Sequence, residues 1–357
     1  MREWEKYVRR TVPYTPGEQP AGTDLIKLNT NENPYPPSLK VQECLEKLAA
    51  DTGLLRRYPD PAVGALVHEL AQRYGVSEKQ VFVGVGSDDV LAMSFLTFFG
   101  SGKEILFPDI TYSFYDVWAD VFRIPYRQIP LDDDFRICPE DYRRENGGIV
   151  FPNPNAPTGE LLELKTVRDI LDHNRDVVVI VDEAYIDFGG ESALPLLEEY
   201  DNLLIVQTFS KSRSLAGLRV GFAIGSEQLI GYLQDVKYSF NSYTMNTPAI
   251  MAGTAALQDE TWFRETTDRI IRTRERVKPL FRKLGFSFCD SKANFLFVRH
   301  EKASAADLFE ALKKEHIYVR YFRKPRIDQY LRISIGTDEQ MDTLLAFLKQ
   351  ILGGDGT

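Results

Sequence analysis

The chain has few of the residues that build disulfide frameworks or metal sites. Its 357 residues include three cysteines and four histidines. Cys44, Cys138 and Cys289 are odd in number and far apart, so they predict neither a set of disulfides nor a zinc site. The scattered histidines show no metal-binding spacing either. We therefore expect no metal site, and a reducing compartment such as the cytoplasm.

Long apolar segments and an excess of positive charge are also missing. No apolar run approaches the roughly 20 residues that cross a bilayer. The N-terminal MREWEKYVRR lacks the apolar core of a signal peptide. A net charge of −9 argues against nucleic acid or an anionic membrane as a partner. What remains is an ordinary globular composition, 43% hydrophobic, in a chain long enough for two domains.

Short apolar runs begin at Val81, and segments with helical spacing separate most of them. This alternation predicts an α/β fold with a mostly parallel seven-stranded sheet that is covered on both faces. Ligands of such sheets bind beyond the carboxyl ends of the strands. The predicted strands are Val81–Gly84, Glu104–Phe107, Tyr126–Ile129, Gly148–Phe151, Val177–Val181, Leu203–Val206 and Val220–Ile224.

Further helices and a second group of strands are predicted outside this region, and together the later ones indicate a smaller α+β domain. The predicted helix at Glu260–Leu284 is long and basic, which is most simply explained by a solvated face. The other predicted helices are Pro36–Ala50, Pro61–Tyr74, Glu227–Ser239, Asn246–Gln258, Ser304–Glu315 and about Asp338–Leu352. The predicted strands of the second group are Phe286–Cys289, Asn294–Arg299, Tyr318–Tyr321 and Tyr330–Ile335.

Three strand ends bring polar groups to one edge of the predicted sheet. Lys211 follows the strand Leu203–Val206, Asp182 ends another strand, and the turn-rich loop Asn153–Gly159 follows a third. A lysine at a strand exit can be partly desolvated, which lowers its pKa and frees an amine for Schiff-base chemistry. For a lone lysine a solvated loop position is the simpler explanation, and Asp182 alone could be a helix N-cap.

A turn of small residues, Gly84–Asp89, joins the first predicted strand to a helix. It lacks the third glycine of a dinucleotide-binding fingerprint. Its backbone N–H groups at a helix N-terminus suit a phosphate. An ordinary helix N-cap followed by acidic residues in the first turn explains this segment equally well.

Three motifs occur in a fixed order: NPNAPTG at 153–159, VDEAY at 181–185 and SKSRSLAGLRVG at 210–221. With them the chain resembles the pyridoxal-phosphate-dependent aminotransferases of the aspartate aminotransferase fold, and among these the histidinol-phosphate aminotransferases. The resemblance runs from Tyr14 to about Thr337. It implies the pyridoxal-phosphate-dependent transferase fold, with a large cofactor-binding domain at 30–260. Residues 1–29, an N-terminal arm, and 261–357 would form the small domain.

The resemblance also implies a role for each residue of a pyridoxal 5'-phosphate site. Lys211 would bind the cofactor as a Schiff base and carry protons, and Asp182 would stabilise the protonated ring nitrogen. Tyr185 would hydrogen-bond the phenolic oxygen. Relatives have an asparagine at the position of Ala156, so Asn155 would share that task or Tyr185 would act alone. Tyr112 would stack on the ring, although an ordinary core aromatic is the alternative. The phosphate would be bound by Ser87, Asp88, Ser210, Arg219 and, from a second copy of the chain, Tyr58.

Substrate recognition is implied for a pair of arginines, Arg320 and Arg332, which would bind the substrate phosphate or carboxylate. Tyr14 and Asn33, in the N-terminal arm, would close over the same group. Arg323, Lys324 and Arg326 would add positive charge, unless they are only a solvated loop. The list of implied partners is therefore short: small-molecule substrates and a second copy of the chain, without nucleic acid or membrane.

The activity implied is transfer of an amino group between L-histidinol phosphate and 2-oxoglutarate, a step of histidine biosynthesis, in a cytoplasmic homodimer. An aromatic amino acid aminotransferase or a phosphothreonine decarboxylase of the same fold is the alternative. A cofactor-binding regulator without catalysis is a third possibility. The presence of Lys211, Asp182 and Arg219 argues against that third possibility.

Overall fold

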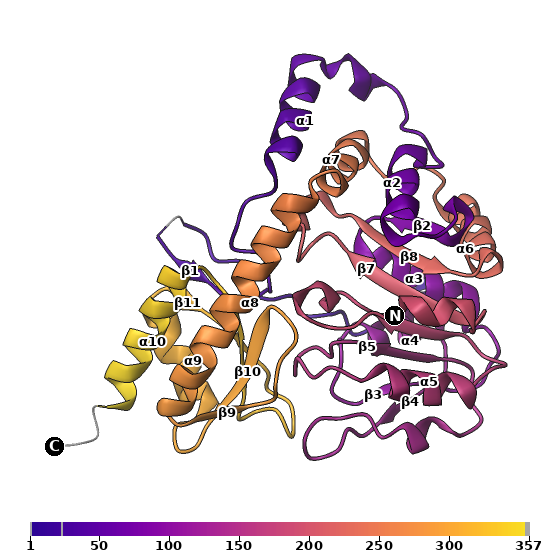
Figure 1. Cartoon of the computed structure of the whole chain (residues 1–357). Helices are drawn as coiled ribbons and strands as arrows, with labels where there is room; N and C mark the ends of the chain where they lie inside the picture. Colours follow the sequence, from indigo (N-terminus) through magenta and orange to yellow (C-terminus); the bar gives the residue numbers. More distant parts are fainter. Residues whose placement is uncertain (1, 23, 354–357) are drawn as a thin grey trace.

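The computed structural model describes residues 2–22 and 24–353. At its centre is a sheet with the strand order β2-β8-β7-β6-β5-β3-β4 (Figure 1). β8 runs antiparallel to β2 and β7, and the other pairs are parallel. The predicted mostly parallel sheet of seven strands is therefore confirmed. The strands are β2 (Val81–Gly84), β3 (Ile105–Pro108), β4 (Tyr126–Ile129), β5 (Ile149–Pro152), β6 (Val179–Asp182), β7 (Leu203–Thr208) and β8 (Gly221–Gly225).

Successive residues of the central strands enter cores on opposite faces of the sheet, as the two-residue period of a strand requires. Ile180 packs in one core, whereas Val179 and Val181 pack in the other. Each of these side chains is fully buried, which stabilises the fold by about 1.5–3 kcal/mol per residue. One face is covered by α3 (Gly86–Phe98), α4 (Tyr115–Phe122) and α6 (Glu227–Phe240), and the other by α2 (Gly64–Tyr74), α5 (Leu164–Asp172) and α7 (Thr247–Leu257).

The register of the parallel strands brings their carboxyl ends together. Pro152 at the end of β5 pairs with Asp182 at the end of β6, and Asp182 pairs with Val206 near the end of β7. The loops that follow these strands therefore leave the sheet along one edge. This edge is where ligands of such sheets bind.

A second, antiparallel sheet has the order β12-β13-β10-β9. Its strands pack against α9 (Ala305–Lys314) and α10 (Asp338–Leu352) around a core of their own. The single strand predicted at Tyr318–Tyr321 is wrong. The chain divides there, because Val319 turns into the core and separates two short strands. The strands of this sheet are β9 (Phe286–Phe288), β10 (Phe295–His300), β12 (Arg320–Tyr321) and β13 (Leu331–Ser334), and β11 (Ile317–Tyr318) precedes β12 outside it.

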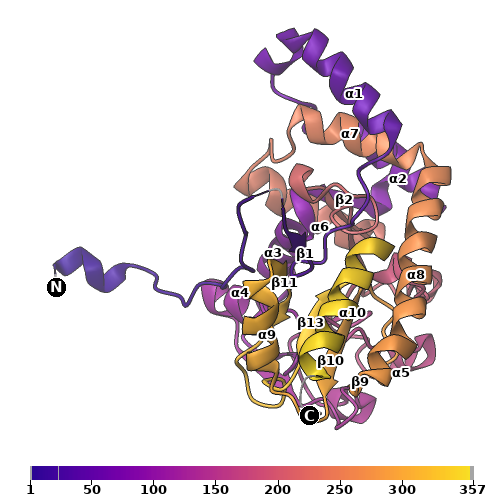
Figure 2. The same ribbon diagram turned by 90° about the vertical axis from the view of Figure 1, so that its left-hand side faces the viewer.

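The N-terminal segment joins this second region. Its strand β1 (Ile26–Lys27) pairs in parallel with β11. Farther upstream, η1 (Glu3–Tyr7) projects away from the rest of the chain (Figure 2). Trp4, Tyr7 and Val12 are exposed there. The division into domains at 30–260 and at 1–29 with 261–357 stays a prediction.

A long helix, α8 (Glu260–Lys283), runs from the region of the large sheet to that of the second sheet (Figure 1). Arg274 in its middle donates from Nη1 to the carbonyl oxygens of Phe188 and Ala293, at 2.8 and 2.9 Å. Only 2% of Arg274 and 3% of Lys278 are exposed. The expectation that the basic residues of this helix form a solvated face is therefore wrong for these two, which bind backbone and acidic groups instead.

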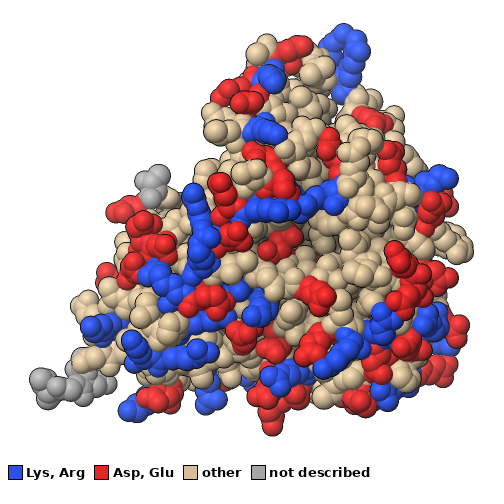
Figure 3. All heavy atoms as spheres, in the orientation of Figure 1, with Lys and Arg blue, Asp and Glu red and all other residues tan. Residues whose placement is uncertain are grey.

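The predicted helix starts near Pro36 and Pro61 lie a few residues too early. α1 (Leu39–Ala50) begins after Ser38, and α2 begins after Val63, whose positive φ of 55° ends the preceding turn. On the face shown in Figure 3, acidic and basic side chains alternate without a large area of one sign. Within the described ranges, no helix is both long and apolar enough to cross a membrane.

Candidate active site

A cavity of about 100 Å³ opens at the carboxyl edge of β5, β6 and β7. Most residues predicted for cofactor binding meet here, although they come from loops far apart in the sequence. The lining residues are Ser87, Asp88, Tyr112, Pro152, Ala156, Asp182, Ala184, Tyr185, Thr208, Ser210, Lys211 and Arg219.

Lys211 is the cation at the centre of this cavity. Its Nζ donates to the carbonyl oxygen of Thr30 at 2.9 Å and lies 5.9 Å from the ring centroid of Tyr185. Burial lowers the pKa of Lys211 to about 8, and the positive charge of Arg332 acts in the same direction. A substantial fraction of this amine is therefore unprotonated near neutral pH, as a nucleophilic lysine requires.

Asp182 is the buried acid of the cavity. Its Oδ2 accepts from the Tyr115 hydroxyl at 2.9 Å, and its Oδ1 accepts from the Ala184 amide at 3.2 Å. Burial raises the pKa of Asp182 to about 7, although both hydrogen bonds favour the ionised form. A cation beside this carboxylate would restore its negative charge.

The hydroxyl of Tyr185 is held from the N-terminal segment. Asn31 donates from Nδ2 to this hydroxyl at 3.0 Å, and its own Oδ1 accepts from Ser334 at 3.0 Å. We did not predict this contact with Tyr185 from the sequence. The sequence did contain a signal, because asparagine tolerates the left-handed backbone that Asn31 adopts, with φ of 57°.

At the other end of the cavity, close backbone approach forms a cradle. A Cβ on Gly221 would lie 2.2 Å from the backbone nitrogen of Ser87, and a Cβ on Gly86 would lie 2.4 Å from Nη2 of Arg219. Only glycine fits at both positions. As a result, the N-terminus of α3 and the guanidinium group of Arg219 reach the same space. Arg219 also donates to Ser210 at 3.2 Å.

Asp88 completes this end of the cavity. Its carboxylate accepts from Nη2 of Arg219 at 3.0 Å and from the Tyr112 hydroxyl at 2.7 Å. Tyr112 is therefore fixed by a hydrogen bond at the edge of the cavity and is more than an ordinary core aromatic. Burial raises the pKa of Tyr112 well above its ordinary value, so its phenol keeps its proton.

Asn155 is the predicted cofactor residue that the structure does not bring into this cavity. Its amide nitrogen donates to the Ile110 carbonyl and to Thr158, both at 3.0 Å. It lines a different hollow, and Ala156 takes the place beside Asp182. The loop thus turns the Asn155 side chain towards Ile110 and Thr158, and Tyr185 and Asn31 remain on the cavity side.

The predicted substrate arginines are neighbours on the second sheet. Arg320 on β12 pairs with Arg332 on β13. Arg332 is partly buried and donates from Nη2 to the Asn29 carbonyl at 2.9 Å, while its buried Nε has no partner in the described part of the chain. Burial lowers the pKa of Arg332, and the charge of Arg320 adds to this effect. Arg320 donates to the carbonyl oxygens of Thr15 and Pro16 at 3.1 and 3.3 Å.

The remaining predicted residues lie around the mouth. Tyr14 stacks on Phe114 with centroids 4.1 Å apart, and Asn33 donates to the Ser212 carbonyl next to Lys211 at 3.2 Å. Tyr58 is 82% exposed and lies outside the cavity. Arg326 is held by Asp109 at 2.7 Å, which makes it a poor candidate for contact with a substrate.

The groups of the cavity fit pyridoxal phosphate, the cofactor that the resemblance implies. The cavity is lined by an amine, a buried carboxylate and a cradle of backbone N–H groups, a hydroxyl and a guanidinium. These match the aldehyde, the basic ring nitrogen and the phosphate of that molecule. Lys211, Asp182 and Arg219 would therefore be its principal contacts.

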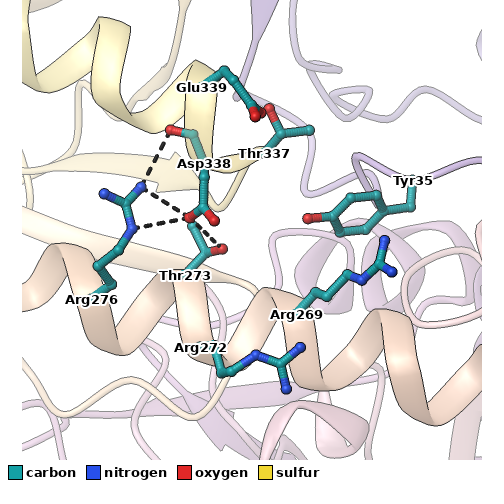
Figure 4. Close-up of a pocket in the computed structure, with 8 residues that line it drawn as sticks. All are labelled: Tyr35, Arg269, Arg272, Thr273, Arg276, Thr337, Asp338 and Glu339. Carbon is teal, nitrogen blue, oxygen red and sulfur yellow. Dashed lines mark hydrogen bonds and ion pairs between the residues drawn. The ribbon is translucent and has the colours of Figure 1, made fainter.

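A second hollow lies between α8 and the start of α10, and it contains charged side chains of both signs (Figure 4). Arg276 donates to Asp338 at 3.0 Å and to Asp342 at 2.6 Å. On the opposite side, the guanidinium of Arg269 lies over the ring of Tyr35 at 5.6 Å. None of its lining residues lines the cavity around Lys211, so this hollow is not the candidate active site.

Comparison with known proteins agrees with this assignment. Residues 23–348 match the family model "Aminotransferase class I and II". The histidinol-phosphate aminotransferase of Lactococcus lactis subsp. cremoris (strain MG1363) is 52% identical over 349 residues, which cover 98% of each chain.

Solved structures show the same fold. The histidinol-phosphate aminotransferase of Sinorhizobium meliloti, solved in complex with pyridoxal-5'-phosphate, superposes with a TM-score of 0.84 at 24% identity, over 92% of this chain and 91% of that one. The L-threonine-O-3-phosphate decarboxylase of Porphyromonas gingivalis gives a TM-score of 0.76 at 21% identity, over 92% and 100%. Fold alone therefore does not separate these two chemistries.

The depressed pKa of Lys211 can be tested by chemical labelling. Reductive methylation with formaldehyde and cyanoborohydride requires the unprotonated amine. In the folded, cofactor-free protein, labelling of Lys211 should rise with pH through a midpoint near 8. In the urea-unfolded chain the midpoint should return to about 10.4, the value of an unperturbed lysine. Peptide mass spectrometry would measure both curves, and identical curves would contradict the desolvated position of Lys211.

Proposed function

The chain belongs to the class I and II aminotransferases, and from this premise we propose that it exchanges an amino group between L-histidinol phosphate and 2-oxoglutarate. The products are imidazole acetol phosphate and glutamate. Support for this substrate comes from the name of the Lactococcus relative and from the pair of arginines beside the cavity. The reaction would be a step of histidine biosynthesis in the cytoplasm.

The observation that carries the proposal is the uncompensated positive charge of Arg320 and Arg332. Both guanidinium groups donate only to backbone carbonyls in the described part of the chain. A cation that loses part of its solvent without gaining an anionic partner is costly, and the buried Nε of Arg332 is in this position. A phosphate dianion would satisfy both groups with charge-assisted hydrogen bonds, and the carboxylate of glutamate would occupy the same place in the second half of the reaction.

The enzyme works with pyridoxal 5'-phosphate, which supplies an electron sink for the bonds at the amino-bearing carbon of the substrate. Asp182 would hold the protonated ring nitrogen, and Tyr185 would donate to the phenolic oxygen. Tyr112 would cover one side of the ring. Ser210, Arg219 and the backbone amides of Ser87 and Asp88 would bind the phosphate.

Lys211 has two tasks in this proposal. Its Nζ would attach the cofactor, and once released it would take the proton from the amino-bearing carbon of the substrate and return it at the next step. A pKa near 8 suits both tasks. Near neutral pH the unprotonated amine can accept the proton as a base, and the resulting ammonium can readily give it back. Tyr14 and Asn33 would close the mouth over the bound substrate.

The activity itself is the first test. Purified protein mixed with L-histidinol phosphate and 2-oxoglutarate should form glutamate. Lys211→Ala should lower the rate by about 10²- to 10⁴-fold or more, because general acid–base catalysis alone contributes that much. Lys165→Ala, which removes an exposed lysine, should leave the rate unchanged. Release of CO₂ from phosphothreonine, with no glutamate from histidinol phosphate, would instead identify a decarboxylase.

Donor specificity tests the arginine pair. Arg320→Ala should lower kcat/KM for histidinol phosphate about ten- to a hundredfold, since a charged hydrogen bond contributes about 1.5–3 kcal/mol. The loss for glutamate should be smaller, because its carboxylate can stay on Arg332. Arg323→Ala, in the exposed loop next to β12, is the matched control. Equal losses for both donors would favour an aromatic amino acid aminotransferase, which phenylalanine and tyrosine as donors would then reveal.

We also infer a homodimer in which Tyr58 reaches the cavity of the second copy. Tyr58 stacks on Tyr243 with centroids 4.6 Å apart, next to the exposed side chains of Leu54, Leu55 and Phe240. An exposed apolar area of this kind is typical of an interface.

Mixing two inactive variants tests the crossing of Tyr58. In a mixed dimer of Lys211→Ala with Tyr58→Ala, one of the two cavities regains both residues. Activity should therefore rise on mixing, towards about a quarter of the wild-type rate, because half of the dimers are mixed and each has one complete site. No gain on mixing, or a fully active monomer in sedimentation, would contradict the proposal.

A further inference from the structure

Behind Asp182, and outside the cavity, lies a second tyrosine. Tyr115 is the first residue of α4 and is fully buried. Its ring packs against Phe107 and Trp118, with centroids 5.9 and 6.2 Å away. Its hydroxyl donates to Oδ2 of Asp182 at 2.9 Å. Tyr115 is not among the residues that line the cavity, and its hydroxyl reaches the cavity only through Asp182.

The surroundings show that this hydroxyl serves Asp182. A phenol hydroxyl buried among aromatic rings is costly unless it finds an acceptor, and the carboxylate is the one that it has. Burial and the neighbouring carboxylate raise the pKa of Tyr115 well above its ordinary value. The phenol therefore keeps its proton and acts as the donor in this pair.

The two hydrogen bonds also fix how the carboxylate of Asp182 is turned. Oδ2 is held by Tyr115 from α4, and Oδ1 by the Ala184 amide from the loop after β6. A carboxylate offers about four acceptor positions, so positions remain for a donor in the cavity that Asp182 lines. The donor that pyridoxal phosphate would offer there is its protonated ring nitrogen.

We propose that Tyr115 is a positioning residue for the reaction: it keeps Asp182 ionised and turned towards the ring nitrogen of the bound cofactor. This inference rests on the proposed function, because the ring nitrogen belongs to the cofactor of that reaction. Tyr115 acts only through Asp182. Loss of the Tyr115 hydroxyl should weaken the interaction of Asp182 with the cofactor without changing the residues that line the cavity.

Other titratable groups face the same space and must be separated from this pair. They are Asp88 on α3, Tyr112 after β3, Tyr185 after β6 and Lys211 after β7. Glu183, next in sequence to Asp182, is also buried with a pKa raised to about 7 by burial. Its carboxylate turns away from the cavity and accepts from Ser192 and Gln207.

The test compares two Tyr→Phe substitutions in the cofactor-free protein. Tyr115→Phe keeps the ring and removes only the hydroxyl. Tyr142→Phe is the matched control, because Tyr142 is also fully buried and its hydroxyl has no hydrogen-bond partner among the described residues. The infrared band of the protonated Asp182 carboxyl, identified by its loss in Asp182→Asn, is followed against pH. This substitution also separates the band from that of Glu183.

In wild type the titration midpoint of Asp182 should lie near pH 7. Tyr115→Phe should raise it by about one to two pH units, since a charged hydrogen bond that favoured the ionised form is lost. Tyr142→Phe should leave it unchanged. At a pH of about 7.5, Tyr115→Phe should also bind pyridoxal phosphate about tenfold more weakly than the wild-type protein. A titration that follows the absorbance of the bound cofactor would measure this affinity.

An unchanged midpoint in Tyr115→Phe, or equal shifts in both variants, would overturn the inference. A raised midpoint with unchanged affinity for pyridoxal phosphate would overturn the role in the reaction, because the hydrogen bond would then not serve the cofactor. These results concern the inference alone. Failure of the wild-type protein to transaminate would count against the proposed function, and the two failures are therefore distinguishable.

Discussion

The desolvation of charge at the carboxyl edge of the large sheet is the constraint on which the site depends. The parallel register of β5, β6 and β7 forces Asp182 and the loop carrying Lys211 to one edge, where the flanking cores exclude water. Burial raises the pKa of Asp182 and lowers that of Lys211, so both values approach neutrality from opposite sides. A carboxyl group and an amine that would be fully charged in water can therefore gain or lose a proton near neutral pH.

Glycine makes this arrangement possible at the phosphate end. Gly86 and Gly221 each leave space that a Cβ would fill, and through this space the N-terminus of α3 and Arg219 approach each other. A side chain at Gly221 would push the start of α3 away from β8, and one at Gly86 would displace the guanidinium of Arg219. The geometry of the cradle therefore depends on two residues that have no functional group of their own. A search of the sequence for reactive side chains would not find them.

The sequence was sufficient to predict the sheet, most helices and the residues around Lys211, because buried strands and motif loops have strong local patterns. It was insufficient where a long-range contact decides the outcome. Val319 divides a predicted strand because each half pairs with a different partner. Asn155 turns away from the cavity to bind the Ile110 carbonyl. Arg274 is buried because it binds two carbonyls from distant loops. No local pattern contains these partners.

The segment at 29–31 connects recognition with chemistry. The carbonyl of Asn29 accepts from Arg332, the carbonyl of Thr30 accepts from Lys211, and Asn31 donates to the Tyr185 hydroxyl. Three consecutive residues therefore contact Arg332 of the second sheet, the amine of Lys211 and the hydroxyl of Tyr185. The pairing of β1 with β11 and the hydrogen bond from the Ser334 amide to the Leu28 carbonyl fix this segment beside the second sheet. A displacement of β13, which carries Arg332, would thus be transmitted to Lys211 through the backbone of residues 29–31.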